Sequence, residues 1–371
     1  MVEWRQFLDA TETSRQVTRF GKDSGRHRIT GAMEHGLNKP IFVVGSPRSG
    51  TSILTWCLGH HPNLFPVPES NWMGDFAVNV AIAYQTGAAR GDYSVLSAME
   101  IRDEDFFATF GQGINDLILR HRKDLENKRE TRSKELKLDA RWLEATSTAA
   151  GPKARWVDGT PEYSMYICGL RKLFPEALFV HIFRDVREVV RSMVNFHRVA
   201  GIQLVASEAE AYQYWIRTVT PCLLAERAYG PNVVRRIRYR DLIDNPESAM
   251  QSLLAFLEEP YTARCLEPLK EQINSSTVPA DFRASNSATD PALVEKASRL
   301  CAELAQSLQP VEASSAAADE MEAAFRERVR YVATLDTTYK VEKPRLESMV
   351  SACQTEKSIQ DSTDCRRPMP A

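Results

Sequence analysis

The sequence lacks the features that mark membrane and nucleic-acid proteins. None of its 371 residues falls in an apolar run of the roughly 18 residues that a membrane span needs, and the first residues lack the apolar core of a secretory signal. Neither sign of charge dominates, because 47 Lys and Arg stand against 49 Asp and Glu. Nucleic-acid binding draws on a strongly basic face. We therefore expect a cytoplasmic protein whose partners include neither membrane nor nucleic acid.

The seven cysteines also lack a pattern. They are scattered along the chain, and no two of them form a C-x-x-C pair. Disulfide frameworks and zinc sites are typically recognised by regular cysteine spacing. The sequence therefore predicts neither a disulfide framework nor a metal site.

What the sequence does contain is an alternation of apolar runs and helical patterns. Residues 40–45 (PIFVVG) form a short continuous run that suits a strand buried on both faces, and residues 51–59 follow with apolar side chains at helical spacing. The apolar runs at 177–183 and 232–239 are also followed by helical patterns. This order predicts an α/β fold, a parallel β-sheet with helices on both faces.

Composition divides the chain into segments. Residues 1–38 are polar and interrupted by glycine, which indicates a leader, and residues 39–310 hold the main domain. Within that domain, about 77–150 is mostly helical by pattern and predicts an inserted helical cover. Residues 311–349 predict a C-terminal helical segment. Residues 350–371 are polar and charged and predict a disordered tail.

The turn after the first strand is typical of an anion-binding loop. Residues 45–52 (GSPRSGTS) lie between a strand and a helix, where backbone N–H groups and the helix N-terminus bind phosphate. The loop is P-loop-like, but Thr51 stands where a Walker A motif has lysine, and the basic residue is Arg48. A magnesium-nucleotide hydrolase is therefore disfavoured.

A second motif follows the strand at 177–183. Residues 183–192 (FRDVREVVRS) place Arg184 at the strand end and Ser192 eight positions later. Arginine offers a bidentate fork to phosphate, and serine adds a hydroxyl donor. This pair suits a terminal phosphate.

Together the two motifs resemble those of sulfotransferases that use 3′-phosphoadenosine 5′-phosphosulfate (PAPS). In that family the first motif binds the 5′-phosphosulfate and the second the 3′-phosphate. The resemblance extends from about residue 40 to residue 279 and is nearest to the tyrosylprotein and heparan-type branches. The segments that support this are His61-Pro62-Asn63 with Glu69, Gly159-Thr160-Pro161, Leu173 to Glu176, and Arg238 to Leu242.

The resemblance implies PAPS as donor, its desulfated product PAP, no metal, and a set of site residues. Glu69 is the general base that it implies, and Glu162, His60 and His61 are the competing candidates. Arg48 acts in both catalysis and cofactor binding. The implied cofactor-binding residues are Arg48, Ser49, Gly50, Thr51, Ser52, Arg184, Ser192 and Tyr239, of which Tyr239 packs beneath the cofactor.

The sequence departs from the family pattern at two places. Gly159 stands where the family has lysine before Thr-Pro, and Lys153, Arg155 or Lys39 could replace that cation. In the C-terminal part, Ser276 matches a serine of the family, but the lysine that should follow is Thr277.

The acceptor is the least specified part of the reaction. Aromatic residues follow Glu69, and they suit either an acceptor pocket or ordinary helix core: Trp72, Phe76, Tyr93, Phe106 and Phe107. We expect sulfuryl transfer to a hydroxyl, or amine, of a small metabolite or sugar. The alternatives are a P-loop phosphotransferase or nucleotide kinase, and a catalytically inactive nucleotide-binding protein of the same fold.

Overall fold

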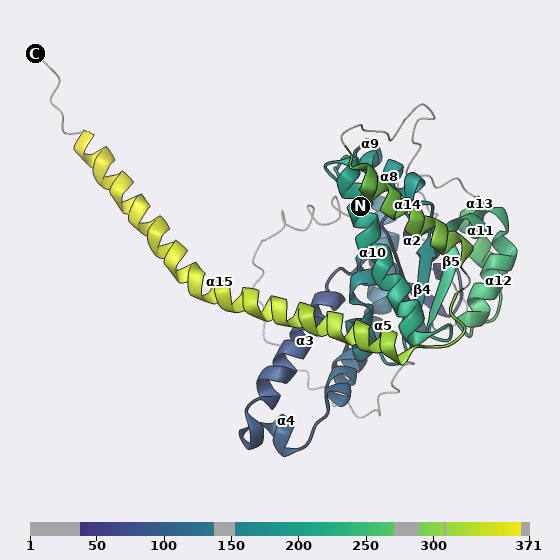
Figure 1. Cartoon of the computed structure of the whole chain (residues 1–371), viewed down its shortest axis with the longest axis horizontal. Helices are drawn as coiled ribbons and strands as arrows, with labels where there is room; N and C mark the ends of the chain where they lie inside the picture. Colours follow the sequence, from purple (N-terminus) through teal and green to yellow (C-terminus); the bar gives the residue numbers. More distant parts are fainter. Residues whose placement is uncertain (1–37, 137–152, 271–288, 308, 365–371) are drawn as a thin grey trace, which may run out of the picture.

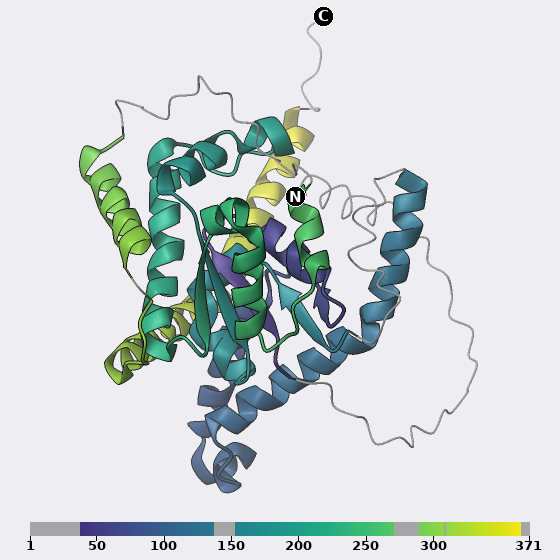
Figure 2. The ribbon, with the colours of Figure 1, turned by 90° about the vertical axis from the view of Figure 1, so that its right-hand side faces the viewer.

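A parallel β-sheet forms the centre of the molecule (Figures 1 and 2). The computed structural model describes residues 38–136, 153–270, 289–307 and 309–364. Its sheet has the strand order β2-β3-β1-β4-β5, and every neighbouring pair runs parallel. The predicted α/β fold is thus confirmed. The strands are β1 (Ile41–Gly45), β2 (Leu64–Pro66), β3 (Arg155–Asp158), β4 (Leu178–Phe183) and β5 (Val234–Arg238).

The alternation of side chains along β1 explains why the strand lies at the centre. Ile41 and Val43 point into one apolar cluster, whereas Phe42 and Val44 point into another on the opposite face. All four side chains are fully buried. A strand with apolar residues at every position is stable only where helices cover both faces of its sheet.

One face of the sheet is covered by helices from both ends of the domain. Leu54 and Leu58 of α2 pack with Leu253 against this face. The helical elements on this side are α2 (Thr51–Gly59), α11 (Tyr239–Asp244), α12 (Pro246–Phe256), the 3₁₀ helix η3 (Ala263–Leu266) and α13 (Glu267–Lys270).

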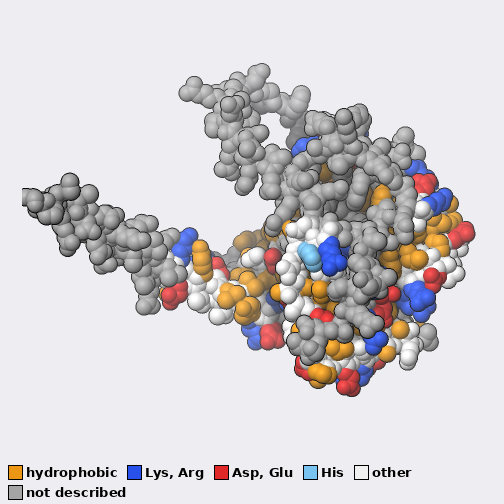
Figure 3. All heavy atoms as spheres, turned by 90° about the horizontal axis from the view of Figure 1, so that it is seen from above, with side chains coloured by type: hydrophobic (Ala, Val, Ile, Leu, Met, Phe, Trp, Pro, Cys, Tyr) orange, Lys and Arg blue, Asp and Glu red, His pale blue; other side chains and the backbone are white. Residues whose placement is uncertain are grey.

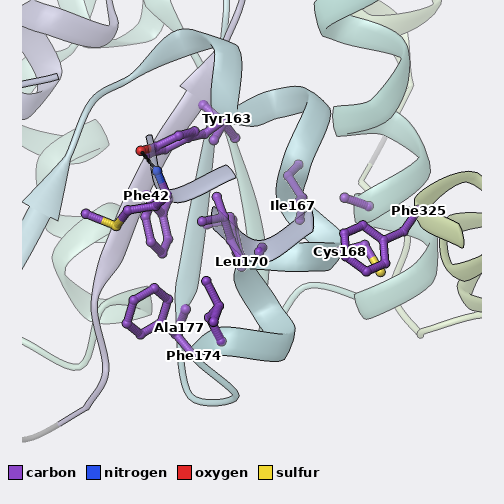
Figure 4. Close-up of a cluster of buried hydrophobic side chains, with 14 of the residues drawn as sticks. Phe42, Tyr163, Ile167, Cys168, Leu170, Phe174, Ala177 and Phe325 are labelled. Carbon is purple, nitrogen blue, oxygen red and sulfur yellow. Dashed lines mark hydrogen bonds between the residues drawn. The ribbon is translucent and has the colours of Figure 1, made fainter. Parts of the chain in front are cut away.

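The other face carries a larger, aromatic core. Phe42 meets the rings of Trp156 and Phe174 at centroid distances of 5.5 and 5.8 Å (Figure 4 labels Phe42 and Phe174). The elements on this side are α3 (Met73–Ala88), α5 (Asp103–Leu136), η2 (Pro161–Tyr166), α7 (Ile167–Leu173) and α10 (Glu208–Tyr229). The remaining elements are η1 (Gly91–Tyr93), α4 (Val95–Ala98), α8 (Val186–Val194), α9 (Phe196–Ala200) and α14 (Pro291–Gln306). The predicted insertion is helical over its described part, from α3 to α5.

The C-terminal helix α15 (Ser315–Asp364) begins on the domain and then leaves it (Figure 1). Near its start, Met321, Phe325 and Val329 join the aromatic core, and Phe325 reaches Cys168 of α7 (Figure 4). Beyond them, hydrophobic side chains are exposed along the helix (Figure 3), including Leu335 at 48%.

The sequence predicted a disordered tail at residues 350–371, but the structure has a helix over the part of this segment that it describes. The helix continues to Asp364, and residues 365–371 lie outside the described part. Residues 345–364 contain neither glycine nor proline, so a polar composition is compatible with a helix there.

Two further predictions concern segments outside the described residues, the leader before residue 38 and Ser276. Within the described part of the chain, no helix is both long and apolar enough to cross a membrane.

Candidate active site

The turn after β1 has the conformation of a phosphate loop. Arg48 and Gly50 have φ angles of 72° and 104°, in the left-handed region that glycine favours. A Cβ on Gly50 would lie 2.5 Å from Cδ2 of Tyr239, so the turn and the Tyr239 ring pack together only because residue 50 lacks a side chain. The amide of Ser49 donates to the carbonyl of Ser46 at 3.1 Å and closes the loop.

The start of α2 has no side-chain cap, and a buried hydroxyl beside it has no partner among the described residues. Gly50 is the N-cap of α2 and supplies no side-chain hydrogen bond to the first turn. The hydroxyl of Ser49 is buried, and it too has no partner there. Unsatisfied N–H groups at a helix N-terminus attract anions. This loop therefore fits the 5′-phosphate part of PAPS or PAP.

The two sequence motifs meet at Arg48. Its Nε donates to Oγ of Ser192 at 3.1 Å, although 144 residues separate them. Its guanidinium stacks over the ring of Phe196 at 4.6 Å. Burial and the neighbouring charge of Arg184 lower the pKa of Arg48, which nevertheless stays protonated at neutral pH. Two close cations favour a ligand with several negative charges.

Arg184 and Tyr239 complete this side of the site. The guanidinium of Arg184 stacks on the Tyr239 ring at 4.6 Å, and one of its nitrogens lies 3.4 Å from the carbonyl oxygen of Arg48. Its Nε donates to Glu188 at 2.7 Å. Ser192 is buried on α8. All of these groups follow the carboxyl ends of β1, β4 and β5, where ligands bind in sheets of this topology.

Glu69 lies at the same edge, in the segment that follows β2. Its side chain is partly buried, and burial raises its pKa to about 7, with further contributions from the negative charges of Glu162 and Asp158. The charge of Arg48 opposes this shift. A carboxylate with a pKa near neutrality is suited to general base catalysis.

Glu162, the competing base, lies close enough to interact with Glu69. Its carboxylate accepts a hydrogen bond from the hydroxyl of Tyr214 at 2.6 Å. Tyr214 comes from α10. Because no local pattern links it to Glu162, the sequence did not predict this contact. One oxygen of the Glu162 carboxylate is therefore already engaged by a protein donor.

Asp158, at the end of β3, is another residue that the sequence analysis did not select. It is fully buried, and burial raises its pKa to about 6 against the effect of its hydrogen bonds. Oδ2 accepts from Ser70 at 2.7 Å, and Oδ1 accepts from the amide and hydroxyl of Thr160 at 2.8 and 2.6 Å. An aspartate that ends a predicted parallel strand would be a candidate site residue. The sequence did not predict β3, so Asp158 was not recognised as one.

None of the three replacement cations reaches the position of the missing lysine. Lys153 donates to the carbonyls of Gly59 and Leu64, and Arg155 pairs with Glu259 at 2.9 Å. Lys153 and Arg155 lie at the beginning of β3, and Lys39 precedes β1. The three therefore belong to the amino edge of the sheet, a strand length from the loop, because the strands are parallel.

The place of the missing lysine is closed by packing. A Cβ at Gly159 would lie 2.2 Å from Oγ1 of Thr55 on α2. Any side chain at residue 159 would need α2 or Thr55 to move. Arg48 and Arg184, whose charges interact, are two cations that do lie at this edge.

The two histidines also lie away from the site. His60 follows the last turn of α2, and its Nδ1 is 3.0 Å from the carbonyl of Trp56. His61 is fully buried, with Nε2 2.9 Å from the carbonyl of Pro260. Both positions are structural, at the amino edge of the sheet.

The aromatic candidates separate into core and surface. Phe107 is buried in the aromatic core, and Tyr93 is 99% exposed on η1. Trp72 is 42% exposed and contacts Phe76, with ring centroids 5.7 Å apart. Phe106 packs against the core from its edge. Of the aromatic candidates, Trp72 and Phe76 are the nearest to Glu69 along the chain.

The part of the chain that contains this site is similar to known proteins. The model of the sulfotransferase family matches residues 40–263. A protein of Aquifex aeolicus is 24% identical over 64% of this chain, which spans 28% of that relative. A putative protein-tyrosine sulfotransferase of Caenorhabditis briggsae is 24% identical over 61% of this chain and 68% of its own length.

The sulfotransferase domain from the curacin biosynthetic pathway is 18% identical, with a TM-score of 0.39, over 78% of this chain and 97% of that domain. Because the family model covers more than half of the chain, from β1 to the start of η3, the chain belongs to the sulfotransferase family.

Proposed function

We propose that this protein transfers a sulfuryl group from PAPS to an acceptor hydroxyl or amine, with Glu69 as the general base. The observation that carries this proposal is the 3.1 Å contact between Arg48 and Ser192, which unites the two phosphate motifs. Glu69 lies near enough to Arg48 for their charges to interact. The anion site and the base are therefore neighbours.

The residues at the carboxyl edge fit the donor. Arg48, Ser49 and the amides from Gly50 to Ser52 would hold the 5′-phosphosulfate. Arg184 and Ser192 would hold the 3′-phosphate, with Tyr239 packed beneath. When bound, PAPS supplies a sulfuryl group attached to a phosphate leaving group. The guanidinium of Arg48 would stabilise the negative charge that grows there during transfer.

Glu69 would remove the acceptor proton. A group with a pKa of about 7 is partly ionised at neutral pH, and it retains enough basicity to accept a proton in the transition state. Glu162 is the weaker candidate because Tyr214 already donates to it. No step of this scheme assigns a role to a metal.

A small metabolite or sugar is the acceptor that we propose. The name of the Caenorhabditis briggsae relative makes a tyrosine side chain the second acceptor class to test. We further propose a cytoplasmic location, which fractionation of cells would test.

Glu69→Gln tests the assignment of the base. We expect kcat for transfer from ³⁵S-labelled PAPS to fall roughly 100- to 10,000-fold, the usual effect of losing a general base. Binding of PAP should stay within about two-fold of the unchanged protein. Glu162→Gln is the matched comparison and should retain most of the activity. Full turnover in Glu69→Gln would exclude Glu69, and an equal loss in both variants would leave the two carboxylates sharing the role.

Two alternatives make different predictions in the same assay. A phosphotransferase would need ATP and Mg²⁺, and the lysine of a nucleotide P-loop is replaced by Thr51. An inactive nucleotide-binding protein would bind PAP but give no labelled product with any acceptor hydroxyl.

A further inference from the structure

Ser70, the residue that follows Glu69, is held by both of its polar groups. Its amide donates to Oγ1 of Thr160 at 3.0 Å, and its hydroxyl donates to Oδ2 of Asp158 at 2.7 Å. Asp158 is fully buried at the end of β3, in the interior of the sheet. The backbone next to Glu69 is thus attached to a fixed carboxylate.

The charge of Asp158 sets the direction of the hydrogen bonds around it. As a carboxylate it only accepts, so the single hydroxyl protons of Ser70 and Thr160 both point toward it. Their lone pairs are then free to accept from the segment beside Glu69. Oγ1 of Thr160 accepts the Ser70 amide, and Oγ of Ser70 accepts the hydroxyl of Tyr163.

Tyr163 extends this network to the first residue of α3. Its oxygen accepts the amide of Met73 at 2.9 Å, a bond drawn at the Tyr163 hydroxyl in Figure 4. The Tyr163 ring is buried against Phe42 of β1, with centroids 5.8 Å apart. Residues 70–73 are therefore fixed at both ends by groups that belong to the sheet and its core.

We propose that Asp158 is the positioning residue for Glu69, acting through Ser70 and Thr160 to fix the segment that carries the base. This inference rests on the proposed function of Glu69. Asp158 touches neither acceptor nor donor in this role. It orients the hydroxyls that hold the backbone, and its negative charge acts on Glu69 directly.

The groups that face Glu69 come from several elements. Asp158 on β3 and Glu162 on η2 raise its pKa, Arg48 after β1 lowers it, and Tyr214 of α10 reaches this set through Glu162. Removing the charge of Asp158 should therefore lower the pKa of Glu69, because one of the two negative neighbours is lost.

Amide hydrogen exchange tests the attachment without any turnover. In Asp158→Asn the Nδ2 group can donate but not accept, so the hydroxyl of Ser70 must reverse and its charge-assisted bond to the carboxylate is lost. We expect the amides of Ser70 and Met73 to exchange at least ten-fold faster in Asp158→Asn and in Ser70→Ala. Ser164→Ala is the matched control, because its buried hydroxyl has no partner among the described residues and its loss should leave this exchange unchanged.

Carboxyl-carbon NMR of glutamate-labelled protein measures the charge effect. The Glu69 signal is assigned by its absence in Glu69→Gln. We expect its pKa to fall in Asp158→Asn and to stay close to its original value in Ser70→Ala, which keeps the charge of Asp158. An unchanged Glu69 pKa in Asp158→Asn would overturn the electrostatic part of the proposal.

Steady-state kinetics then separates positioning from a structural role. In Ser70→Ala we expect kcat to fall at least ten-fold with KM for PAPS unchanged, since misplacement of a catalytic group by about 1 Å can cost 100-fold. Ser70→Thr keeps the hydroxyl and should restore most of kcat. Equal kcat in Ser70→Ala and the unchanged protein, or unchanged exchange at Ser70, would overturn the proposal even if Asp158→Asn fails to fold.

The same experiments distinguish this inference from the proposed function. If no acceptor is sulfated by the unchanged protein, the proposed function fails, whereas exchange and NMR still show whether Asp158 fixes and tunes Glu69. If transfer occurs but Ser70→Ala changes neither exchange nor kcat, only the positioning role fails.

Discussion

At the scale of single residues, the site brings like charges together. Arg48 lies beside Arg184, and Glu69 lies near Asp158 and Glu162. Such neighbours destabilise a folded protein, because burial strengthens their repulsion. The two arginines suit a ligand with several negative charges. The neighbouring carboxylates suit a base that must accept a proton. The stability lost here is consistent with a functional site.

The raised pKa of Glu69 gives a prediction about stability and pH. The folded pKa of about 7 lies above the reference value of 4.5, so the folded state favours the protonated form. This contribution to stability is present below about pH 4.5 and is lost as pH rises through 7. Glu69→Gln keeps a neutral side chain at every pH. We therefore expect the free energy of unfolding of the variant to exceed that of the unchanged protein by on the order of 2 kcal/mol at pH 8. Near pH 4 the two free energies of unfolding should differ little.

Urea unfolding at a series of pH values measures this difference. Glu176→Gln, at an exposed position, serves as control and should change little at either pH. A stability difference for Glu69→Gln that does not vary with pH would contradict the account.

At the scale of elements, the sequence predicted the strands that belong to continuous apolar runs and missed the short ones. The run that became β1 is buried and apolar up to Gly45, and the run that became β4 is buried and apolar except for His181. Strand β5 keeps enough apolar residues to be recognised. By contrast, β2 has three residues and ends in proline, and β3 begins with Arg155 and ends with Asp158. Buried charges at strand ends are stable only with tertiary partners, which a sequence pattern does not reveal.

The same distinction applies to the candidate site. Arg48, Arg184 and Ser192 belong to local motifs, so their place at one edge of the sheet could be anticipated. Tyr214 and Asp158 join the site through contacts with Glu162 and Ser70 that are distant in sequence. Residues that act through such contacts have no local signature, and the structure alone reveals them.

Helix α15 gives a prediction about which of its turns stabilise the domain. Phe325 is 7% exposed and packs beside Gly169 of α7, whereas Leu335, ten residues later, is 48% exposed. We expect Phe325→Ala to lower the free energy of unfolding by about 3 kcal/mol, because it leaves a cavity in the aromatic core. Leu335→Ala should change it by less than about 0.5 kcal/mol.

Denaturant unfolding of the two variants decides this point. Equal, small losses would show that α15 does not contribute to the core. A large loss in Leu335→Ala would show that the exposed part of α15 is packed in solution.

At the scale of the whole molecule, the parallel sheet explains how distant motifs form one site. Because β1 and β4 are adjacent and parallel, the segments after them meet at one edge, although Arg48 and Ser192 are 144 residues apart. Helices on both faces hold that edge in place. We propose that this edge binds a nucleotide with both 3′- and 5′-phosphates.

Calorimetric titration with PAP in the presence of EDTA, beside a titration with ATP and Mg²⁺, tests this binding. We expect metal-free binding of PAP that weakens roughly 10- to 100-fold in Arg184→Ala, the effect of losing a charged hydrogen bond of about 1.5–3 kcal/mol. Arg187→Ala, at an exposed position on α8 three residues later, should bind PAP as before. Preference for ATP with Mg²⁺, or PAP binding that is unchanged in Arg184→Ala, would contradict the account.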